Sequence, residues 1–176
     1  MRVLLDEQRL RAGVEGLAEK INQIYGQQPL TIVGIMTGSI ILVADVVRLL
    51  EMPLRVGVVQ TSSYEGTQRQ KIRINAEMMP DITGRDVLLV DDIFDTGHTM
   101  TEVISLMNEL RPASLRSAVL LSKTGRREVD LTPDFVVFDI PDEFVVGYGL
   151  DYQDEYRNLP FVAALEPADI ENVCEQ

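Results

Sequence analysis

Short apolar runs alternate along this chain with stretches of helical periodicity, and this alternation limits the folds open to it. The runs have the apolar and β-branched content of buried strands and comprise residues 30–36, 54–61, 86–92, 115–121, 135–138 and 161–165. Helical stretches follow the runs at 30–36 and 86–92, so strands and helices alternate as in βαβ units, and the chain shows no internal repeat. We therefore predict an α/β fold with a central, mostly parallel twisted sheet flanked by helices.

Three stretches are predicted to be helices, at residues 10–24, 40–50 and 99–110. The first should bury one face and end at Gly26, because its apolar residues recur at steps of three and four: Leu10, Val14, Leu17, Ile21 and Ile24. The last should do the same with Met100, Val103, Ile104, Met107 and Leu110. Residues 62–75 are polar and are expected to form a loop with an edge hairpin.

Size and charge narrow the class of protein. The chain has 176 residues, which predicts one domain, and 16 Lys and Arg against 28 Asp and Glu give a net charge of −12. An acidic surface argues against general binding of nucleic acids or anionic membranes. Cys174 is the single cysteine, so an internal disulfide is excluded. The sequence lacks the long apolar stretch that a signal peptide or a membrane span needs. We expect a soluble cytoplasmic protein.

The segment VLLVDDIFDTGHTMT, residues 87–101, carries the clearest chemistry. A buried strand ends in Asp91 and Asp92, Asp95 follows, and Gly97 permits a tight turn into a helix. Free amides at a helix start bind anions such as a phosphate monoester, and hydroxyls of nearby threonines assist. The carboxylates suit sugar hydroxyls or Mg²⁺. The pattern predicts a sugar-phosphate site; the alternative is a strand end with Asp95 or Thr96 as a helix cap.

Four segments resemble one known family. VLLVDDIFDTGHT is similar to the phosphoribosyl-pyrophosphate signature of type I phosphoribosyltransferases. VGIMTGSIILVADVVR resembles the pyrophosphate loop of the hypoxanthine-guanine branch, SSYEGT resembles the start of its mobile loop, and PDFVVFDIPDEFVVGYGLDYQDEYRNLPFVAAL resembles its purine-binding hood. The resemblance covers residues 30–165 and implies transfer of a phosphoribosyl group to a 6-oxopurine.

The resemblance also implies an organisation and partners. One domain, residues 1–176, would have a core at about 26–140 and a small hood made by the N-terminal segment and residues 141–176. The substrates would be phosphoribosyl pyrophosphate and free hypoxanthine or guanine, the products IMP or GMP and pyrophosphate, and the cofactor Mg²⁺. The family implies a homodimer or homotetramer.

Residue roles follow from the same resemblance. Asp95 would be the general base and acid at the purine N7, and Asp91 and Asp92 would hold the ribose. The 5′-phosphate would lie on Asp95, Thr96, Gly97, His98 and Thr99. Pyrophosphate and the lid would involve Thr37, Gly38, Ser62, Tyr64 and Arg157, and the purine would contact Ile93, Lys123, Phe144, Val145 and Asp151. The metal ligands would be Asp91, Asp92 and Asp151.

Some features leave alternatives open. Thr37 stands where many relatives have lysine, in a loop that often contains a non-proline cis peptide, so only backbone contacts are expected there. Arg126 and Arg127 could line the mouth of the site with other basic residues, but they are expected to be solvated surface residues. The same signature occurs in an RNA-binding attenuation regulator, and a xanthine-preferring enzyme is a further alternative. Asp95 and the acidic net charge favour an enzyme that binds no nucleic acid.

Overall fold

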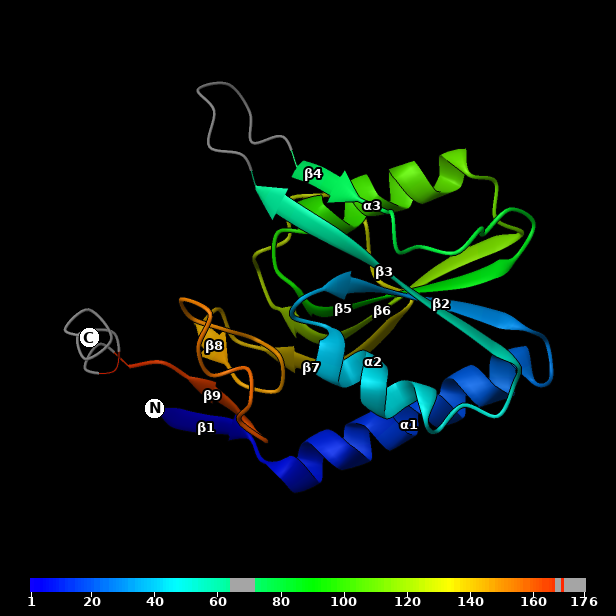
Figure 1. Ribbon diagram of the computed structural model, residues 1–176. Coiled ribbons are helices and arrows are strands. Elements are labelled where there is room, and N and C mark those ends of the chain that lie inside the picture. Colours follow the sequence, from blue (N-terminus) through cyan, green and yellow to red (C-terminus); the bar gives the residue numbers. More distant parts are fainter. Residues whose placement is uncertain (64–71, 167–168, 170–176) are drawn as a thin grey trace.

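The computed structural model describes residues 1–63, 72–166 and 169, and its central feature is a six-stranded sheet (Figure 1). The strand order is β4-β3-β2-β5-β6-β7. Their bounds are β2 Leu30–Met36, β3 Leu54–Ser63, β4 Ile72–Asn75, β5 Asp86–Phe94, β6 Ser114–Lys123 and β7 Phe135–Ile140. All neighbours are parallel except β3 and β4, which form the expected edge hairpin. The predicted α/β class and mostly parallel sheet are confirmed.

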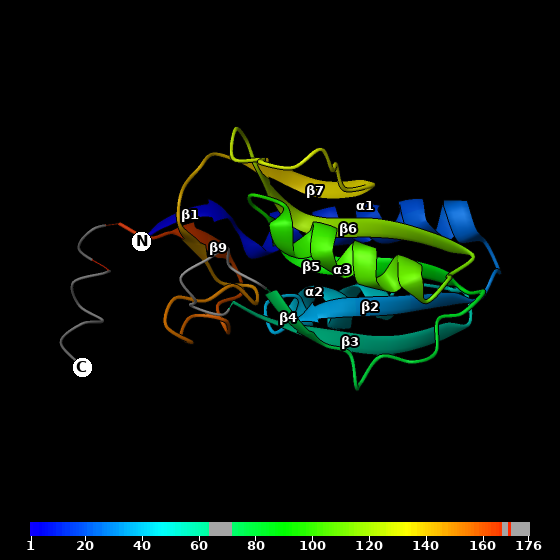
Figure 2. The ribbon, with the colours of Figure 1, turned by 90° about the horizontal axis from the view of Figure 1, so that it is seen from above.

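Helices cover both faces of this sheet (Figure 2). Helices α1, Glu7–Tyr25, and α2, Ile40–Val47, lie on one face, and α3, His98–Glu109, lies on the other (Figure 1). Each face has its own apolar core, the first with Leu10 and Ile21, the second with Met100 and Met107. Covering from both sides buries most of the central strands β2 and β5, which explains their continuous apolar sequence, whereas Val56 of β3 is 51% exposed.

The helix ends depart from the prediction in three places. Ile24 is 47% exposed and Leu110 is 40% exposed, so neither belongs to the buried face expected of it. Tyr25 takes the buried place at the end of α1. Helix α2 ends at Val47 rather than at residue 50. The Asn22 side chain donates to the Leu49 carbonyl at 3.0 Å, and this contact from α1 stabilises a turn there.

A second sheet of three strands lies beside the first and brings the two ends of the described chain together. Strand β1, Arg2–Leu5, pairs antiparallel with β9, Val162–Ala164, which pairs with β8, Val145–Val146. The sequence did not predict β1 or β8, because both are too short to show a period. No helix in the described ranges is both long and apolar enough to span a membrane.

Candidate active site

The parallel strands β2, β5 and β6 have their carboxyl ends at the same edge of the sheet. Ligands bind at this edge in folds of this class. In the parallel register Ile93 of β5 lies opposite Leu121 of β6, so the residues after both strands are neighbours. A cavity of about 260 Å³ opens here, lined by Ile35, Met36, Gly38, Thr61, Asp91, Asp92, Ile93, Phe94, Asp95, Thr96, Gly97, Thr99 and Met100. A larger groove of about 610 Å³ lies between α1, α2 and residues 157–160, away from the acidic pair.

The two adjacent aspartates occupy the last part of β5, which extends to Phe94 and is longer than predicted. Asp91 is 7% exposed, and its Oδ1 accepts from the Asp92 amide at 3.0 Å. Asp92 Oδ1 accepts from the Ile93 amide at 2.9 Å. Burial raises the pKa of Asp91 well above its ordinary range, and the neighbouring Asp92 adds to this. Burial also raises the pKa of Asp92. Such a pair favours ligands that stabilise its negative charge, either hydroxyl groups that donate hydrogen bonds or a cation.

A glycine turn joins β5 to α3. Gly97 has φ of +90°, and a Cβ there would lie 2.4 Å from Val129 Cγ2 and 2.6 Å from Phe94 Cζ, so only glycine fits. Helix α3 has no side-chain cap at its start. No side-chain cap therefore competes with an anion for the amides of its first turn.

Asp95 does not cap this helix, so the capping alternative is wrong. Its Oδ2 accepts from Lys123 Nζ at 3.1 Å and its Oδ1 from Arg126 Nε at 2.9 Å. Burial alone would raise the pKa of Asp95, but hydrogen bonds from Arg126 and Lys123 outweigh it and lower that pKa. The carboxylate is held anionic by two cations. The expectation that Arg126 is merely solvated is also wrong, whereas Arg127 donates to Thr132 Oγ1 at 2.6 Å, away from Asp95.

The loop after β2 packs closely on both the acidic pair and the segment after β8. A Cβ on Gly38 would lie 1.8 Å from Asp92 Oδ2, and one on Gly149 would lie 2.1 Å from the Gly38 carbonyl oxygen. The peptide between Met36 and Thr37 is cis. The loop backbone at Gly38 thus lies against the Asp92 carboxylate on one side and against the Gly149 backbone on the other, with no room for a side chain at either glycine.

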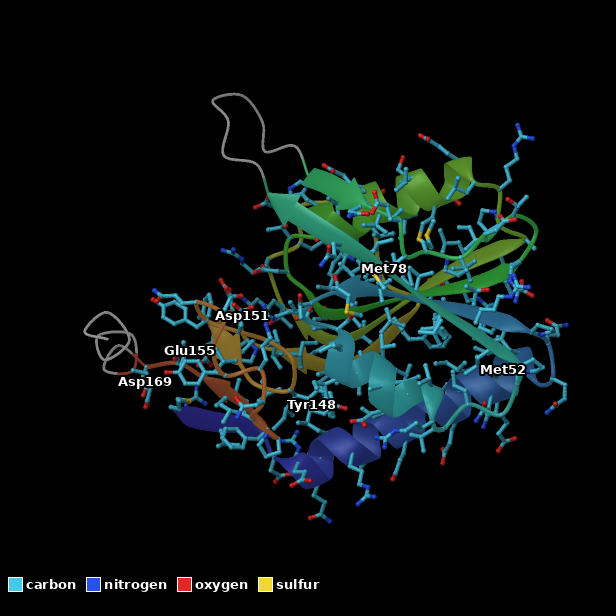
Figure 3. The ribbon with its side chains drawn as sticks, viewed as in Figure 1. Met52, Met78, Tyr148, Asp151, Glu155 and Asp169 are labelled. Carbon is cyan, nitrogen blue, oxygen red and sulfur yellow. The ribbon has the colours of Figure 1, made fainter. Side chains whose placement is uncertain are left out.

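The segment after β8 carries a second charged group. Arg157 Nη1 donates to the Gly149 carbonyl at 2.8 Å, and its Nη2 lies 2.8 Å from Asp151 Oδ1. Tyr148 donates from its hydroxyl to Asp45 Oδ2 of α2 at 2.6 Å. Figure 3 shows Tyr148 on the side of this segment toward α2, with Asp151 and Glu155 farther from that helix. The tyrosine therefore ties the segment to the helix that follows the Gly38 loop.

Phe144, the residue directly before β8, presents an exposed aromatic ring. Phe144 is 51% exposed and its ring meets Tyr152 edge-on, with centroids 5.5 Å apart. Val145 is buried in β8. Asp142, two residues before Phe144, lies 3.7 Å from both Lys123 Nζ and Arg126 Nε. This contact brings the start of the segment to the Asp95 cluster.

Comparisons with known proteins agree on one family. The profile of the phosphoribosyl transferase domain matches residues 3–153. The hypoxanthine phosphoribosyltransferase of Haemophilus influenzae is 40% identical over 91% of this chain and 92% of its own. The hypoxanthine-guanine phosphoribosyltransferase of Aquifex aeolicus is 40% identical over 94% and 95%.

The chain belongs to the hypoxanthine-guanine phosphoribosyltransferase family.

A solved structure supports the same assignment. The hypoxanthine phosphoribosyltransferase of Trypanosoma cruzi in complex with the product IMP superposes with a TM-score of 0.89 at 34% identity, covering 96% of each chain. The resemblance, the fold class and the prediction of an enzyme are confirmed: this chain is a phosphoribosyltransferase.

This phosphoribosyltransferase brings most of the predicted site residues to one place. Eight of them line the 260 Å³ cavity: Gly38, Asp91, Asp92, Ile93, Asp95, Thr96, Gly97 and Thr99. Lys123 joins them through Asp95. The His98 side chain instead lies 3.0 Å from Glu128 Oε2, and Arg157 lines the larger groove. Ser62 is at the end of β3, whereas Tyr64 is outside the described residues, as is most of the predicted lid.

Four site residues of this phosphoribosyltransferase were not predicted: Arg126, Asp142, Tyr148 and Gly149. Each contacts a residue that is distant in sequence, and a single sequence gives no signal of such pairs. Gly149 of VGYGLDY is the nearest to a signal, because a glycine lets another backbone approach closely.

Proposed function

We propose that this chain transfers the 5-phosphoribosyl group of phosphoribosyl pyrophosphate to hypoxanthine or guanine, giving IMP or GMP and pyrophosphate. The observation that carries the proposal is the contact between Lys123 and Asp95. The lysine side chain is only 10% exposed and its Nζ lies 3.1 Å from the carboxylate, beside the Gly97 turn. The buried ammonium can donate a hydrogen bond, and the carboxylate can take a proton. Next to a phosphate-binding turn, this pair suits a heterocycle that accepts a hydrogen bond at one atom and loses a proton from another.

In the reaction, the bond from ribose C1′ to the pyrophosphate oxygen breaks and the bond from C1′ to purine N9 forms. Asp95 takes the proton from N7, and its low pKa, set by its cation partners, supports an anionic base at neutral pH. Lys123 donates to the 6-oxygen, because an ammonium has only donors. Proton transfer of this kind contributes about 10²–10⁴ in rate.

The remaining roles are proposed from the family resemblance. Asp91 and Asp92 bind the ribose hydroxyls, and the residues of the Gly97 turn bind the 5′-phosphate through their backbone: Asp95, Thr96, Gly97, His98 and Thr99. Pyrophosphate contacts the backbone of Thr37 and Gly38 and the guanidinium of Arg157, with Ser62 and Tyr64 in the lid. Phe144 and Ile93 pack on the purine faces, and Val145 and Asp151 contact its edge through their backbone.

Magnesium is proposed as the cofactor, with Asp91, Asp92 and Asp151 as ligands. The buried aspartate pair supplies hard oxygen donors, which fits Mg²⁺. No group of three or more acidic, His or Cys side chains within the described residues forms a metal cluster, so phosphate and water oxygens would complete the shell. When bound, the ion neutralises charge on the leaving pyrophosphate.

The test is a phosphoribosyl-pyrophosphate-dependent assay against free hypoxanthine, guanine, xanthine, adenine and uracil. We expect IMP and GMP to form and adenine to be rejected. Faster turnover of xanthine would favour the xanthine-preferring alternative, and no product with any base would favour the RNA-binding regulator. Asp95 and the net charge of −12 favour the enzyme over the RNA-binding regulator. Three further properties remain predictions. They are the organisation as one domain with a purine-binding hood, the assembly into a homodimer or homotetramer, and the cytoplasmic location.

A further inference from the structure

Two cations hold Asp95, one on each oxygen. Lys123, the last residue of β6, donates to Oδ2, and Arg126, three residues later in the following turn, donates to Oδ1. The assignment of Lys123 to the purine leaves Arg126 without a role. Its side chain is 46% exposed, yet its Nε lies 2.9 Å from the carboxylate Oδ1.

Asp142 is a second anion within reach of both cations. Its Oδ1 lies 3.7 Å from Lys123 Nζ and 3.7 Å from Arg126 Nε, beyond hydrogen-bond distance in each case. The pairing shown here thus favours Asp95 over Asp142, although either anion could accept from either cation after a small movement.

Purine binding brings a second acceptor to Lys123. If the 6-oxygen takes a hydrogen bond from Lys123, the ammonium has to be shared with Asp95 or to leave it. Arg126 is then the cation that still holds Asp95, through the oxygen that Lys123 does not touch. A carboxylate held at one oxygen presents its other oxygen to the purine in a defined direction.

We propose that Arg126 is a positioning residue of the reaction: it aims Asp95 at the purine and keeps it anionic once Lys123 turns to the 6-oxygen. The inference rests on the proposed function, because it takes Asp95 as the base. It adds a residue for which neither the resemblance nor the comparisons give a role.

Other charged groups near Asp95 are already engaged. On β5, Asp91 and Asp92 accept from backbone amides at 3.0 and 2.9 Å. At the start of α3, His98 pairs with Glu128 at 3.0 Å. Arg126 is therefore the cation that remains on Asp95 when Lys123 is used elsewhere, with Asp142 as its competing partner.

The test compares Arg126→Gln with Arg127→Gln, a matched control from the adjacent position. In Arg126→Gln, the acidic limb of kcat/KM for hypoxanthine should move up by about one pH unit, the size expected when a carboxylate loses a neighbouring arginine. We expect kcat at neutral pH to fall about tenfold, near the low end of proton-transfer effects, with KM for phosphoribosyl pyrophosphate unchanged. Arg127→Gln should change none of these.

Carboxyl-carbon NMR of Asp95 gives a readout that does not need turnover. Its titration in the substrate-free protein should shift in the same direction in Arg126→Gln, and Arg126→Lys should lie between that variant and the wild type. Asp142→Asn should cause no upward shift, because it leaves both cations to Asp95.

The outcomes separate the two proposals. If Asp95→Asn keeps wild-type turnover, the proposed function itself is wrong. If Asp95→Asn is inactive while Arg126→Gln shifts neither the limb nor the NMR titration, only the inference about Arg126 fails. An equal shift in Arg127→Gln would also overturn it, because the effect would then be one of net charge.

Discussion

The Asp92 carboxylate occupies the space where Gly38 would carry a side chain: a Cβ there would lie 1.8 Å from Asp92 Oδ2. The glycine belongs to the loop after β2 and the aspartate to β5, so this contact fixes how closely two strand ends meet. It also makes the position of the acidic pair depend on a residue with no functional group of its own.

Gly38→Ala should therefore reduce activity without unfolding the protein. The methyl group displaces the Asp92 carboxylate from its hydrogen bond with the Ile93 amide, and misplacement of a reacting site by about 1 Å can cost ~10²-fold in rate. Steady-state kinetics and circular dichroism measure the two effects. Gly16→Ala is the control, because a Cβ there meets nothing within 4 Å, and it should leave activity unchanged. Wild-type kinetics in Gly38→Ala would contradict the tight contact.

Asp95→Asn should lower turnover by about 10²–10⁴-fold while the protein still folds and binds IMP. The amide keeps the shape of the side chain but cannot take a proton at neutral pH. In the wild type, the pKa of Asp95 is below its ordinary value of 3.8, so no loss of rate from its protonation is expected between pH 5 and 8. The pH–rate profile and IMP binding by calorimetry check both statements. Loss of folding in Asp95→Asn would instead indicate a structural role.

Lys123→Met should reduce the use of hypoxanthine far more than any residual use of adenine. The buried ammonium donates to a 6-oxygen but faces the hydrogens of a 6-amino group, so the wild type should prefer hypoxanthine by at least ~10² in kcat/KM. Kinetics with both bases in wild type and variant measure this preference. Comparable wild-type rates with adenine and hypoxanthine would contradict the assignment of Lys123.

Tyr148→Phe should destabilise the protein by about 1–3 kcal/mol, because the half-buried Asp45 carboxylate loses a hydrogen bond of 2.6 Å from a buried hydroxyl. Burial, and then the bond to Asp45, raises the pKa of Tyr148 above its ordinary value of 10.0. A raised pKa contributes stability that is complete below pH 10 and is lost as the pH rises through the folded-state value.

The difference in free energy of unfolding between Tyr148→Phe and wild type should thus be constant near neutral pH and shrink above about pH 10. Urea unfolding at several pH values measures it. Asp45→Asn, which retains an acceptor oxygen, should lose less stability than Asp45→Ala. A gap between Tyr148→Phe and wild type that grows at high pH would contradict the hydrogen bond.

Removal of divalent metal should abolish turnover. The acidic pair and the phosphate oxygens of the substrate are ligands for a hard cation, and the described residues alone offer no complete shell. The measurement is the rate with excess chelator and after Mg²⁺ is added back, with circular dichroism to show that the fold is unaffected. Full turnover in chelator would remove the metal from the proposal.

The sequence alone determined the strands of the six-stranded sheet, most of the buried faces of α1 and α3, and the phosphate turn. Strand β2 begins and ends where the apolar run does, at Leu30 and Met36. Gly97 and the acids before it lie at the predicted end of a strand and start of a helix. These features follow from the periodicity and the chemistry of neighbouring residues, which a single sequence shows directly.

Only the tertiary structure decided which charges meet. Arg126 and Asp95 are 31 residues apart in the chain, and Tyr148 and Asp45 are 103 apart. The short strands β1 and β8 likewise form only because β9 supplies their hydrogen-bonding partner. Such contacts depend on how strands are ordered in the sheet and on where each segment returns to it. Local propensity carries no information about that order, because the energy that selects it comes from the packing of distant segments.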